Sequence, residues 1–357
     1  MTDGTGASDA TSAPAAPDAL EALGWSGHWA ALAASGPPGA RPGRILRHDS
    51  TAVMVGMADD VVVRQIRPAL PPLAVGDWLL VDDEAIVDVL PRTSLLQRRD
   101  PTRGGAQLIA ANVDLVGIVC GLDRPVKAGR IQRFVVQVFD SGAIPAVVLT
   151  KADLVDDPLD AVAAVERAAP GVDVIVCSVR TDVGLSTLRA AVRDRTVAFV
   201  GESGAGKSTL VNALAGSELA ATSAVRKGDS KGRHTTTSRE LHVLPGHCCL
   251  VDTPGLREIG VFTDVDTVDD AFGDVATELD EECRFRDCTH TSEPGCAVLA
   301  AIARGDLDGD RYAAWQALRA EAEAADLRGD PVARRQAEKR FGRMAREAQR
   351  LERGGDR

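Results

Sequence analysis

The sequence predicts an α/β protein in three parts: a small β-barrel, an open parallel sheet with a phosphate-binding loop, and a cysteine-rich helical segment. Three observations lead to this prediction. Short apolar runs separated by turn residues fill residues 41–97, strand-like and helix-like runs alternate in residues 98–265, and three cysteines and a histidine cluster within residues 266–357. Such alternation is typical of a parallel sheet. Residues 1–40 are expected to be a disordered acidic leader with one short helix.

Length, apolar runs and cysteine use limit the class of protein. At 357 residues the chain is long enough for two or three domains. It contains no apolar run of about eighteen residues, so no membrane-spanning helix is expected, and its start lacks the pattern of a secretory signal. Four of the seven cysteines lie in strand-like runs and the others cluster. This pattern suits a metal site in a reducing cytoplasm better than a disulfide framework.

The formal net charge of −11 argues against a general affinity for nucleic acid, but the charge is unevenly distributed. Five cations stand against one acid, Asp229, between Arg226 and Arg239, and ten arginines and lysines stand against five acids in residues 328–357. Local basic surfaces are therefore expected. The C-terminal stretch is either a solvated charged helix or an added contact with RNA.

Five short strands are expected in the barrel part of the chain. They are residues 43–47, 51–55, 61–66, 77–81 and 85–90. Five strands in about fifty residues are typical of an OB-type barrel, which binds oligonucleotides in some proteins, and equally of a purely structural barrel. Trp78 is the single aromatic residue in these runs, so stacking on single-stranded bases is expected to be weak.

The central part is expected to hold five strands and the helices between them. The strands are residues 113–120, 145–149, 172–177, 197–200 and 248–251, and the helices are residues 128–141, 159–169 and 186–194, with a further helix after the 197–200 strand and its loop. Ligands of open α/β sheets bind outside the carboxyl ends of the strands. The polar residues that follow these strands are therefore the candidate site.

One of these strand ends carries the pattern G-x-x-x-x-G-K-S. Glycines there let backbone N–H groups surround phosphate oxygens at a helix N-terminus. Lys207 would reach the β- and γ-phosphates, and Ser208 would be a Mg²⁺ ligand. A glycine-rich turn that binds nothing is the alternative, but the strand–loop–helix context favours a nucleoside triphosphate site. The candidate residues are Gly201, Glu202, Ser203, Gly204, Ala205, Gly206, Lys207, Ser208 and Thr209.

Residues at the ends of other strands are expected to complete the nucleotide-binding site. Asp252 is the expected second carboxylate for Mg²⁺, and Gly255 would donate its N–H to the γ-phosphate. Residues 150–153 match the guanine-reading box [NT]-K-x-D. The aspartate of this box selects guanine because its carboxylate accepts both N1–H and N2–H₂ of guanine, whereas adenine would leave the carboxylate unpaired. Backbone N–H groups at the next strand end would meet the guanine O6. The candidate base-binding residues are Thr150, Lys151, Ala152, Asp153, Ser178 and Val179.

The guanine box precedes the phosphate loop, the reverse of a Ras-like chain, so the same site would be assembled by a circular permutation. With a barrel before it and a cysteine cluster after it, the chain resembles the ribosome small subunit-dependent GTPase family (RsgA, also called YjeQ) over roughly residues 43–312. The segments that carry the resemblance are 74–78, 89–92, 109–114, 141–143, 149–154, 201–208, 232–237 and 252–255.

The resemblance implies a cytoplasmic enzyme that hydrolyses GTP to GDP and phosphate with Mg²⁺. It also implies stimulation by the small (30S) ribosomal subunit, a role in late maturation of that particle, and contact with 16S rRNA by a monomer. Two rival classes stay open. One is a GTP-loaded placeholder whose hydrolysis is incidental, and the other is a P-loop ATPase or kinase, against which Asp153 argues.

Two positions depart mildly from the family pattern, and a third position differs from Ras-type enzymes in a way that bears on the mechanism. Thr150 replaces a frequent Asn, so its tether to the phosphate loop is expected to be weaker, and Ala205 replaces a frequent Val. Leu256 stands where Ras-type enzymes orient water with glutamine, so slow intrinsic hydrolysis is expected.

Another residue or a partner would then complete the catalytic site. His234 is the candidate, with contact to RNA or solvent as the alternative, and Thr236 or Thr237 is the expected switch ligand to Mg²⁺ and the γ-phosphate.

Cys283, Cys288, His290 and Cys296 supply three thiolates and an imidazole within fourteen positions. Zn²⁺ favours such a set, and four protein ligands leave no open position, so a structural zinc ion is predicted. Buried free cysteines with a surface histidine are the alternative, but the same spacing occurs in the RsgA family. Residues 256–280 join the γ-phosphate motif to this segment, which suggests that the nucleotide state repositions it.

Overall fold

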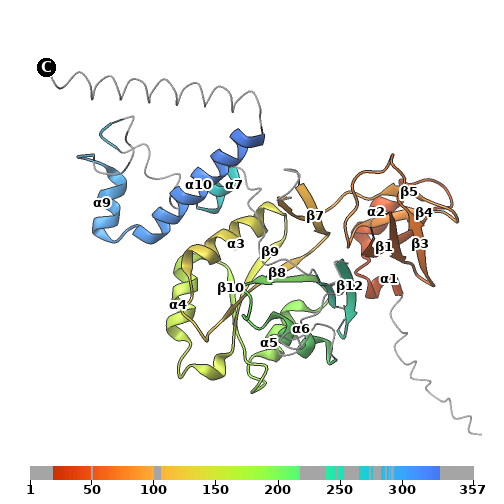
Figure 1. Ribbon diagram of the computed structural model, residues 1–357, viewed down its shortest axis with the longest axis horizontal. Helices are drawn as coiled ribbons and strands as arrows, with labels where there is room; N and C mark the ends of the chain where they lie inside the picture. The colour runs from red at the N-terminus through yellow and green to blue at the C-terminus, as the bar shows by residue number, and fades with distance from the viewer. Residues whose placement is uncertain are drawn as a thin grey trace, which may run out of the picture.

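A computed structural model describes most of the three predicted parts. The described residues are 19–49, 51–99, 106–217, 239–246, 248–252, 265–272, 275, 283–285, 288, 290 and 293–329. The strands of the first and central parts form one 11-stranded sheet with the main order β10-β9-β8-β11-β13-β12-β1-β2-β3. The C-terminal helices lie beyond α3, on the opposite side of the central sheet from the N-terminal strands (Figure 1).

The N-terminal part contains the five expected strands, preceded by two short helices. Strand β1 is shared, because its first half pairs with β4 and its second half pairs with β2. A bulge between Ile45 and Arg47 interrupts the pairing of β1 with β2. The elements are α1 (Ala19–Ala22), α2 (Gly27–Ala33), β1 (Arg41–His48), β2 (Ala52–Gly56), β3 (Val61–Gln65), β4 (Trp78–Val81) and β5 (Ile86–Val89).

The central part is a parallel sheet covered by helices on both faces, as the alternation of strands and helices predicts. Apolar residues of α3 and α4 pack on one face, and those of α5 and α6 pack on the other. The elements are β8 (Leu115–Gly121), α3 (Ala128–Asp140), β9 (Ile144–Thr150), η1 (Ala152–Leu154), α4 (Leu159–Ala168), β10 (Asp173–Val176), α5 (Leu185–Val192), β11 (Thr196–Gly201), α6 (Lys207–Ala215) and β13 (Cys248–Asp252).

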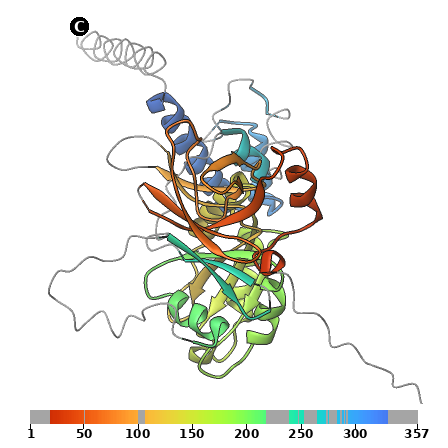
Figure 2. The ribbon, with the colours of Figure 1, turned by 90° about the vertical axis from the view of Figure 1, so that its right-hand side faces the viewer.

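Three strands were not expected from the sequence. Strands β6 (Leu95–Arg99) and β7 (Ala106–Ala111) form a separate antiparallel pair. Strand β12 (Arg239–Leu244) lies between the helix expected after the phosphate loop and the strand expected at residues 248–251, and it pairs with β13 on one side and β1 on the other. Its pairing joins the N-terminal strands to the central sheet, as the side view shows (Figure 2).

A buried arginine secures the junction between these two parts. The side chain of Arg44 is almost fully buried and donates to the carbonyl oxygens of Leu23 at 2.5 Å, Asn112 at 3.0 Å and Gly76 at 3.2 Å. Its guanidinium also lies 5.2 Å from the ring centre of Trp78. A buried cation is tolerated only when its donors are satisfied, so this network fixes the first helices, β1 and the β7–β8 connection together.

The C-terminal helices α7 (Val265–Ala271), α9 (Ala297–Arg304) and α10 (Gly309–Gly329) surround a third apolar core, which also includes Val136 of α3. Arg311 of α10 donates to the carbonyl oxygen of Ala168 at 3.0 Å, and Arg133 of α3 pairs with Glu321 at 2.9 Å. Both contacts dock α10 on the central part. Within the described ranges, no helix has the length and apolarity needed to cross a membrane.

Candidate functional site

Five parallel strands bring the predicted nucleotide motifs to one edge of the central sheet. Strands β10, β9, β8, β11 and β13 are parallel neighbours in that order, so their carboxyl ends coincide. The guanine box follows β9, Ser178 follows β10, the phosphate loop follows β11 and Asp252 ends β13. Residues that are far apart along the chain therefore share the crevice where ligands of open sheets bind.

The phosphate loop leaves β11 in a conformation that requires glycine. Gly201 has φ +138°, and a Cβ there would lie 2.2 Å from the carbonyl oxygen of Val119. Gly206, with φ +94°, is the N-cap of α6, whose first residue is Lys207. The Lys207 ammonium donates back across the loop to the carbonyl oxygens of Gly201 at 2.8 Å and Glu202 at 2.6 Å. The half-buried Ser208 lies in the first turn of α6.

The Thr150 side chain joins the guanine box to the phosphate loop. Its hydroxyl lies 2.6 Å from the carbonyl oxygen of Ala205, to which it donates, and 3.3 Å from that of Cys120. The residue is 4% exposed. A buried hydroxyl–carbonyl bond of this length is short for its class, so threonine bridges the two motifs despite being shorter than asparagine.

Lys151 and Asp153 are held in defined positions on either side of Ala152. Lys151 has a left-handed φ of 60°, and its ammonium donates to the carbonyl oxygen of Gly204 at 2.7 Å. The Ser178 hydroxyl donates to the Asp153 carboxylate at 2.5 Å, and Arg180 lies 3.6 Å from its other oxygen. The hydrogen bond from Ser178, and then the charge of Arg180, lower the pKa of Asp153 below its ordinary value. The carboxylate is therefore a pure acceptor at neutral pH, which suits two guanine N–H donors.

One expected N–H donor is engaged within the loop instead. The backbone N–H of Ser178 donates to the carbonyl oxygen of Val183 at 2.9 Å. Ser178 therefore contributes by orienting Asp153 through its hydroxyl, while the N–H of Val179 remains the predicted donor to the base.

The sequence analysis missed a charged group that follows β8. Asp123 lies 2.9 Å from the Lys151 ammonium, and Arg124 lies 3.3 Å from the Glu202 carboxylate of the phosphate loop. The hydrogen bond from Lys151 lowers the pKa of Asp123. The rule that polar residues follow the strand ends, applied to β8 as well, would have found these residues.

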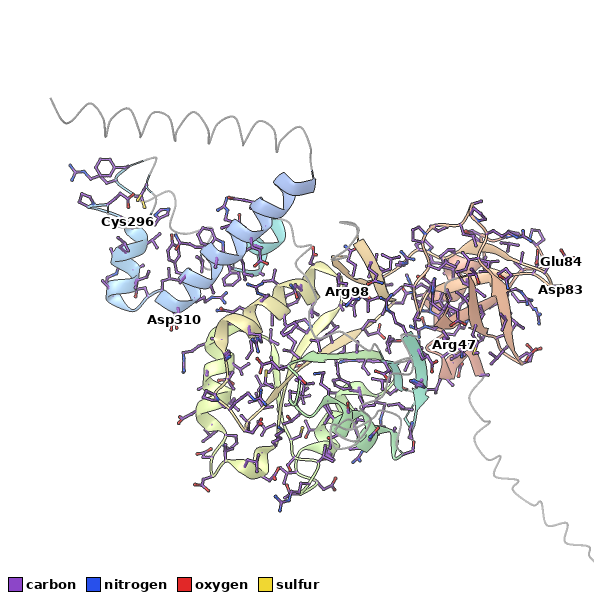
Figure 3. The ribbon with its side chains drawn as sticks, in the orientation of Figure 1. Arg47, Asp83, Glu84, Arg98, Cys296 and Asp310 are labelled. Atoms are coloured by element: carbon purple, nitrogen blue, oxygen red, sulfur yellow. The ribbon has the colours of Figure 1, made fainter. Side chains whose placement is uncertain are left out.

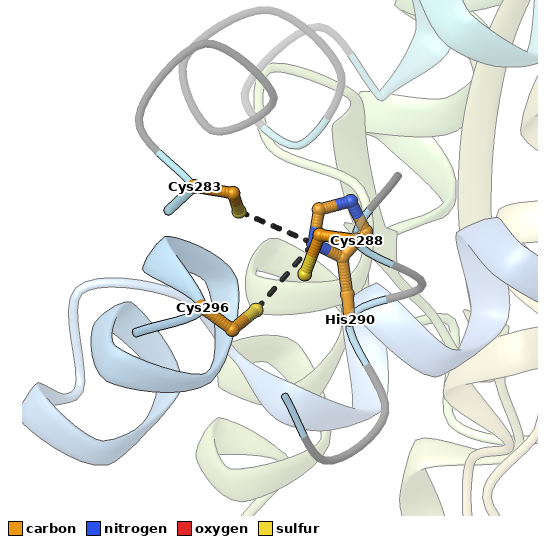
Figure 4. A group of neighbouring side chains, drawn as sticks. All are labelled: Cys283, Cys288, His290 and Cys296. Carbon is orange, nitrogen blue, oxygen red and sulfur yellow. Dashed lines mark hydrogen bonds between the residues drawn. The ribbon is translucent and has the colours of Figure 1, made fainter. Parts of the chain in front are cut away.

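The four predicted metal ligands converge although they come from separate turns (Figure 4). Their ligand atoms all lie within 4.8 Å of one another. His290 Nδ1 lies 3.5 Å from the sulfur of Cys283 and 3.4 Å from that of Cys296. Cys296 is the N-cap of α9, and the N–H groups of Ala297 and Leu299 point at the Cys283 and Cys296 sulfurs. Three sulfur atoms and one ring nitrogen that lie this close together fit a tetrahedral metal.

Several predicted residues lie outside the described part of the chain. They are Gly255, Leu256, His234, Thr236 and Thr237. Asp252 is described and lies at the end of β13, directly beside β11 in the sheet.

Comparisons with known proteins agree with this arrangement. Residues 89–262 match the model of the family described as RsgA GTPase. A Streptomyces coelicolor protein, "Small ribosomal subunit biogenesis GTPase RsgA", is 43% identical over 94% of this chain and 96% of its own length. A Lactiplantibacillus plantarum relative, "Small ribosomal subunit biogenesis GTPase RsgA 2", is 41% identical over 77% of this chain and 79% of its own length.

Two solved structures share the fold. YloQ, described as a circularly permuted GTPase, has a TM-score of 0.55 and 26% identity, covering 81% of this chain and 97% of its own. YjeQ from Thermotoga maritima has a TM-score of 0.60 and 24% identity, covering 79% of this chain and 98% of its own. The order of the motifs and the extent of these matches show that the chain belongs to the RsgA GTPase family.

Proposed function

We propose that this GTPase binds GTP in the crevice at the strand ends and hydrolyses it to GDP and phosphate with the help of Mg²⁺. The observation that carries the proposal is the joining of the guanine box to the phosphate loop by Thr150 and Lys151. Asp153 would accept the guanine N–H groups, and Lys207 would bind the β- and γ-phosphates. Ser208 and Asp252 would hold Mg²⁺, whose charge stabilises the phosphates in the transition state.

The Cys283, Cys288, His290 and Cys296 cluster would hold one structural Zn²⁺. Three sulfurs and one imidazole nitrogen are the ligands that this ion prefers, and they lie close together. His290 would bind through Nδ1, the ring nitrogen that faces two of the sulfurs.

The proposed partner is the small ribosomal subunit, including its 16S rRNA, and the place of action is the cytoplasm, with the chain as a monomer. The relatives named above are small-subunit biogenesis GTPases. Segments distant in the sequence also meet where β1 joins β12, because Arg239 of β12 is the register partner of His48 and donates to the carbonyl oxygen of Leu108 in β7. Burial and the nearby charge of Arg98 lower the pKa of Arg239, so the arginines of β6 and β12 lie close to one another.

The arginines at this junction are the proposed contacts for RNA phosphates, and Arg47 also faces the carboxylates of Asp49 at 3.2 Å and Glu240 at 3.9 Å. Arg47 and Arg98 lie at the junction, whereas Asp83 and Glu84 lie at the far tip of the N-terminal strands (Figure 3). Phosphate contacts made by arginines would give a salt-dependent affinity for rRNA. The acidic tip would face away from it.

The deciding experiment is GTP hydrolysis by the purified chain alone, with small subunits, with large subunits and with bare rRNA. Slow intrinsic turnover raised many-fold by small subunits alone would support the proposal. Tight GTP binding without stimulation by any of them would retain the nucleotide site but refute the proposed partner, and ATP competing as well as GTP would refute guanine selectivity.

The residue that positions the hydrolytic water is proposed to be His234, with Thr236 or Thr237 as the switch ligand. Turnover of His234→Ala at saturating small subunits tests the histidine. An unchanged rate would exclude it.

A further inference from the structure

A ring of charged contacts connects the phosphate loop to the guanine box through the end of β8. Arg124 Nη1 lies 3.3 Å from the Glu202 carboxylate, and Arg124 Nη2 lies 3.2 Å from the Asp123 carboxylate. Asp123 in turn lies 2.9 Å from the Lys151 ammonium, which donates to the carbonyl oxygen of Gly204 at 2.7 Å. The ring therefore begins and ends in the phosphate loop.

The Arg124 guanidinium also lies against the loop itself. A Cβ built on Gly204 would be 3.4 Å from Arg124 Nη2, so the guanidinium lies beside the open face of this glycine. Arg124 is 41% exposed and reaches the loop from outside. The Asp123 and Glu202 carboxylates hold it from two sides, which restricts a side chain that would otherwise sample many rotamers.

Glu202 places a negative charge inside a loop that would bind a triphosphate. Like charges at short range repel, most strongly where the environment excludes water. Besides Arg124, Arg130 at the start of α3 contacts the same carboxylate. Two arginines thus face this one acid, which indicates that the charge of Glu202 is compensated where phosphates would approach.

We propose that Arg124 is a positioning residue of the nucleotide site: Asp123 and Glu202 hold its guanidinium against the phosphate loop, where it offsets the Glu202 charge and adds positive potential for the GTP phosphates. This inference rests on the proposed GTP site. The inference requires that removing the Arg124 charge and removing the Glu202 charge change nucleotide affinity in opposite directions, because the guanidinium attracts the phosphates and the carboxylate repels them. The γ-phosphate adds negative charge, so GTP should respond more than GDP.

The test is calorimetric binding of GDP and a non-hydrolysable GTP analogue to the full chain and its variants. Arg124→Gln should weaken the GTP analogue about tenfold and GDP about threefold, and Glu202→Gln should tighten the GTP analogue about threefold. Raising the salt concentration should shrink both effects. Arg304→Gln is the matched control, since Arg304 pairs with Asp306 at the surface where α9 ends, and its nucleotide affinities should not change.

Thermal unfolding of the nucleotide-free variants distinguishes a role of Arg124 in nucleotide binding from a role in stability alone. If Arg124→Gln loses equal affinity for GDP and the GTP analogue and also unfolds at a lower temperature, the proposal is overturned. It is also overturned if Glu202→Gln binds the GTP analogue more weakly, as Arg124→Gln is expected to do. Failure of the unmodified chain to bind GTP would refute the nucleotide site itself. Normal binding by both the unmodified chain and Arg124→Gln would refute this inference alone.

Discussion

At the scale of single residues, the nucleotide site depends on side chains that each make one short, directed contact. The Thr150 hydroxyl reaches Ala205, and the Ser178 hydroxyl reaches Asp153. Both hydroxyls are neutral donors, and without them the Ala205 carbonyl and the Asp153 carboxylate would need hydrogen bonds from water. Their loss should therefore change binding without large changes in shape.

Removing the Thr150 hydroxyl should loosen the phosphate loop. Thr150→Val keeps the volume but leaves the buried Ala205 carbonyl without this donor, which costs about 1–3 kcal/mol. We expect lower GDP affinity and a lower unfolding temperature, measured by calorimetry and thermal denaturation. Thr150→Ser keeps the hydroxyl and should stay near the unmodified protein. A Val variant that behaves like the Ser variant would show that the bond contributes nothing.

Replacing the Asp153 carboxylate should change the base that is preferred. Asp153→Asn loses an acceptor for the guanine N–H donors, so GTP affinity should fall roughly 100-fold. The new amide can donate to the C2 carbonyl of xanthine, so xanthosine triphosphate should bind better than GTP. Equal losses for both nucleotides would instead indicate a misfolded loop.

The pH dependence of guanine selectivity follows from the direction of the Asp153 shift. Its pKa is lowered by Ser178 and Arg180. A lowered pKa keeps the carboxylate ionised down to and below the ordinary range of aspartate, and its contribution is lost only as the pH falls through the lowered value. The GTP-to-ATP affinity ratio should therefore be flat between about pH 5 and pH 8.

At the scale of elements, strands and helix ends connect parts that are distant in sequence. Strand β1 is bonded to β2, β4 and β12, so one strand belongs to both the N-terminal and the central sheet. The N-terminus of α9 points two N–H groups at metal-cluster sulfurs. These shared elements are where single substitutions should have effects beyond their own segment.

Arg44→Met should destabilise the junction between the N-terminal strands and the central sheet. The Leu23 and Asn112 carbonyls lose this donor, while the Gly76 carbonyl keeps the donor of the Asn112 side-chain amide, and the loss costs about 3 kcal/mol or more in the free energy of unfolding. Chemical denaturation measures this loss. Arg64→Met is the control, because Arg64 donates to the Asp82 and Asp83 carbonyls at the surface, and its cost should stay below about 0.5 kcal/mol.

Removing the metal should loosen α9. The purified chain should carry about one zinc ion, and Cys288→Ser should lose it, because a closed structural site needs all four ligands. Amide hydrogen exchange in Ala297–Arg304 should then rise, since metal binding and local folding are coupled. Cys120→Ser, outside the cluster, should keep the zinc. Full zinc content in Cys288→Ser would exclude this ligand set.

At the scale of the whole molecule, the C-terminal helices rest on the nucleotide-binding part through few polar contacts. Arg311 bonds to Ala168 at the end of α4, and Arg133 of α3 pairs with Glu321 of α10. Helix α3 follows the β8 end that carries Asp123 and Arg124. A shift at the phosphate loop therefore has a short path to α10, in addition to the chain connection through residues 256–280.

Hydrogen exchange should report this connection. We expect α9 and α10 to exchange differently in the GDP complex and in the GTP-analogue complex, because the docking contacts start on α3 and α4. Arg311→Met should raise exchange in both complexes and reduce the difference between them. Indistinguishable exchange of these helices in the two complexes of the unmodified chain would contradict coupling between the nucleotide and the metal centre.

The sequence by itself determined the motifs, their order and most of the elements. The phosphate loop, guanine box and cysteine cluster are local patterns whose chemistry depends on residue spacing, so the sequence alone identifies them. The parallel sheet follows from alternating strands and helices. Strand β12 and the β6–β7 pair escaped prediction because short strands at a sheet junction depend on their partners more than on their own pattern.

Only the tertiary structure decided which charges meet. Arg124 and Glu202 are 78 positions apart, and Arg133 and Glu321 are 188 apart. No local pattern specifies such pairs, because they arise when separate strands end at one edge or when a helix docks on another. The structure also showed that the Thr150 hydroxyl reaches the phosphate loop, which depends on how closely the fold brings the guanine box to that loop.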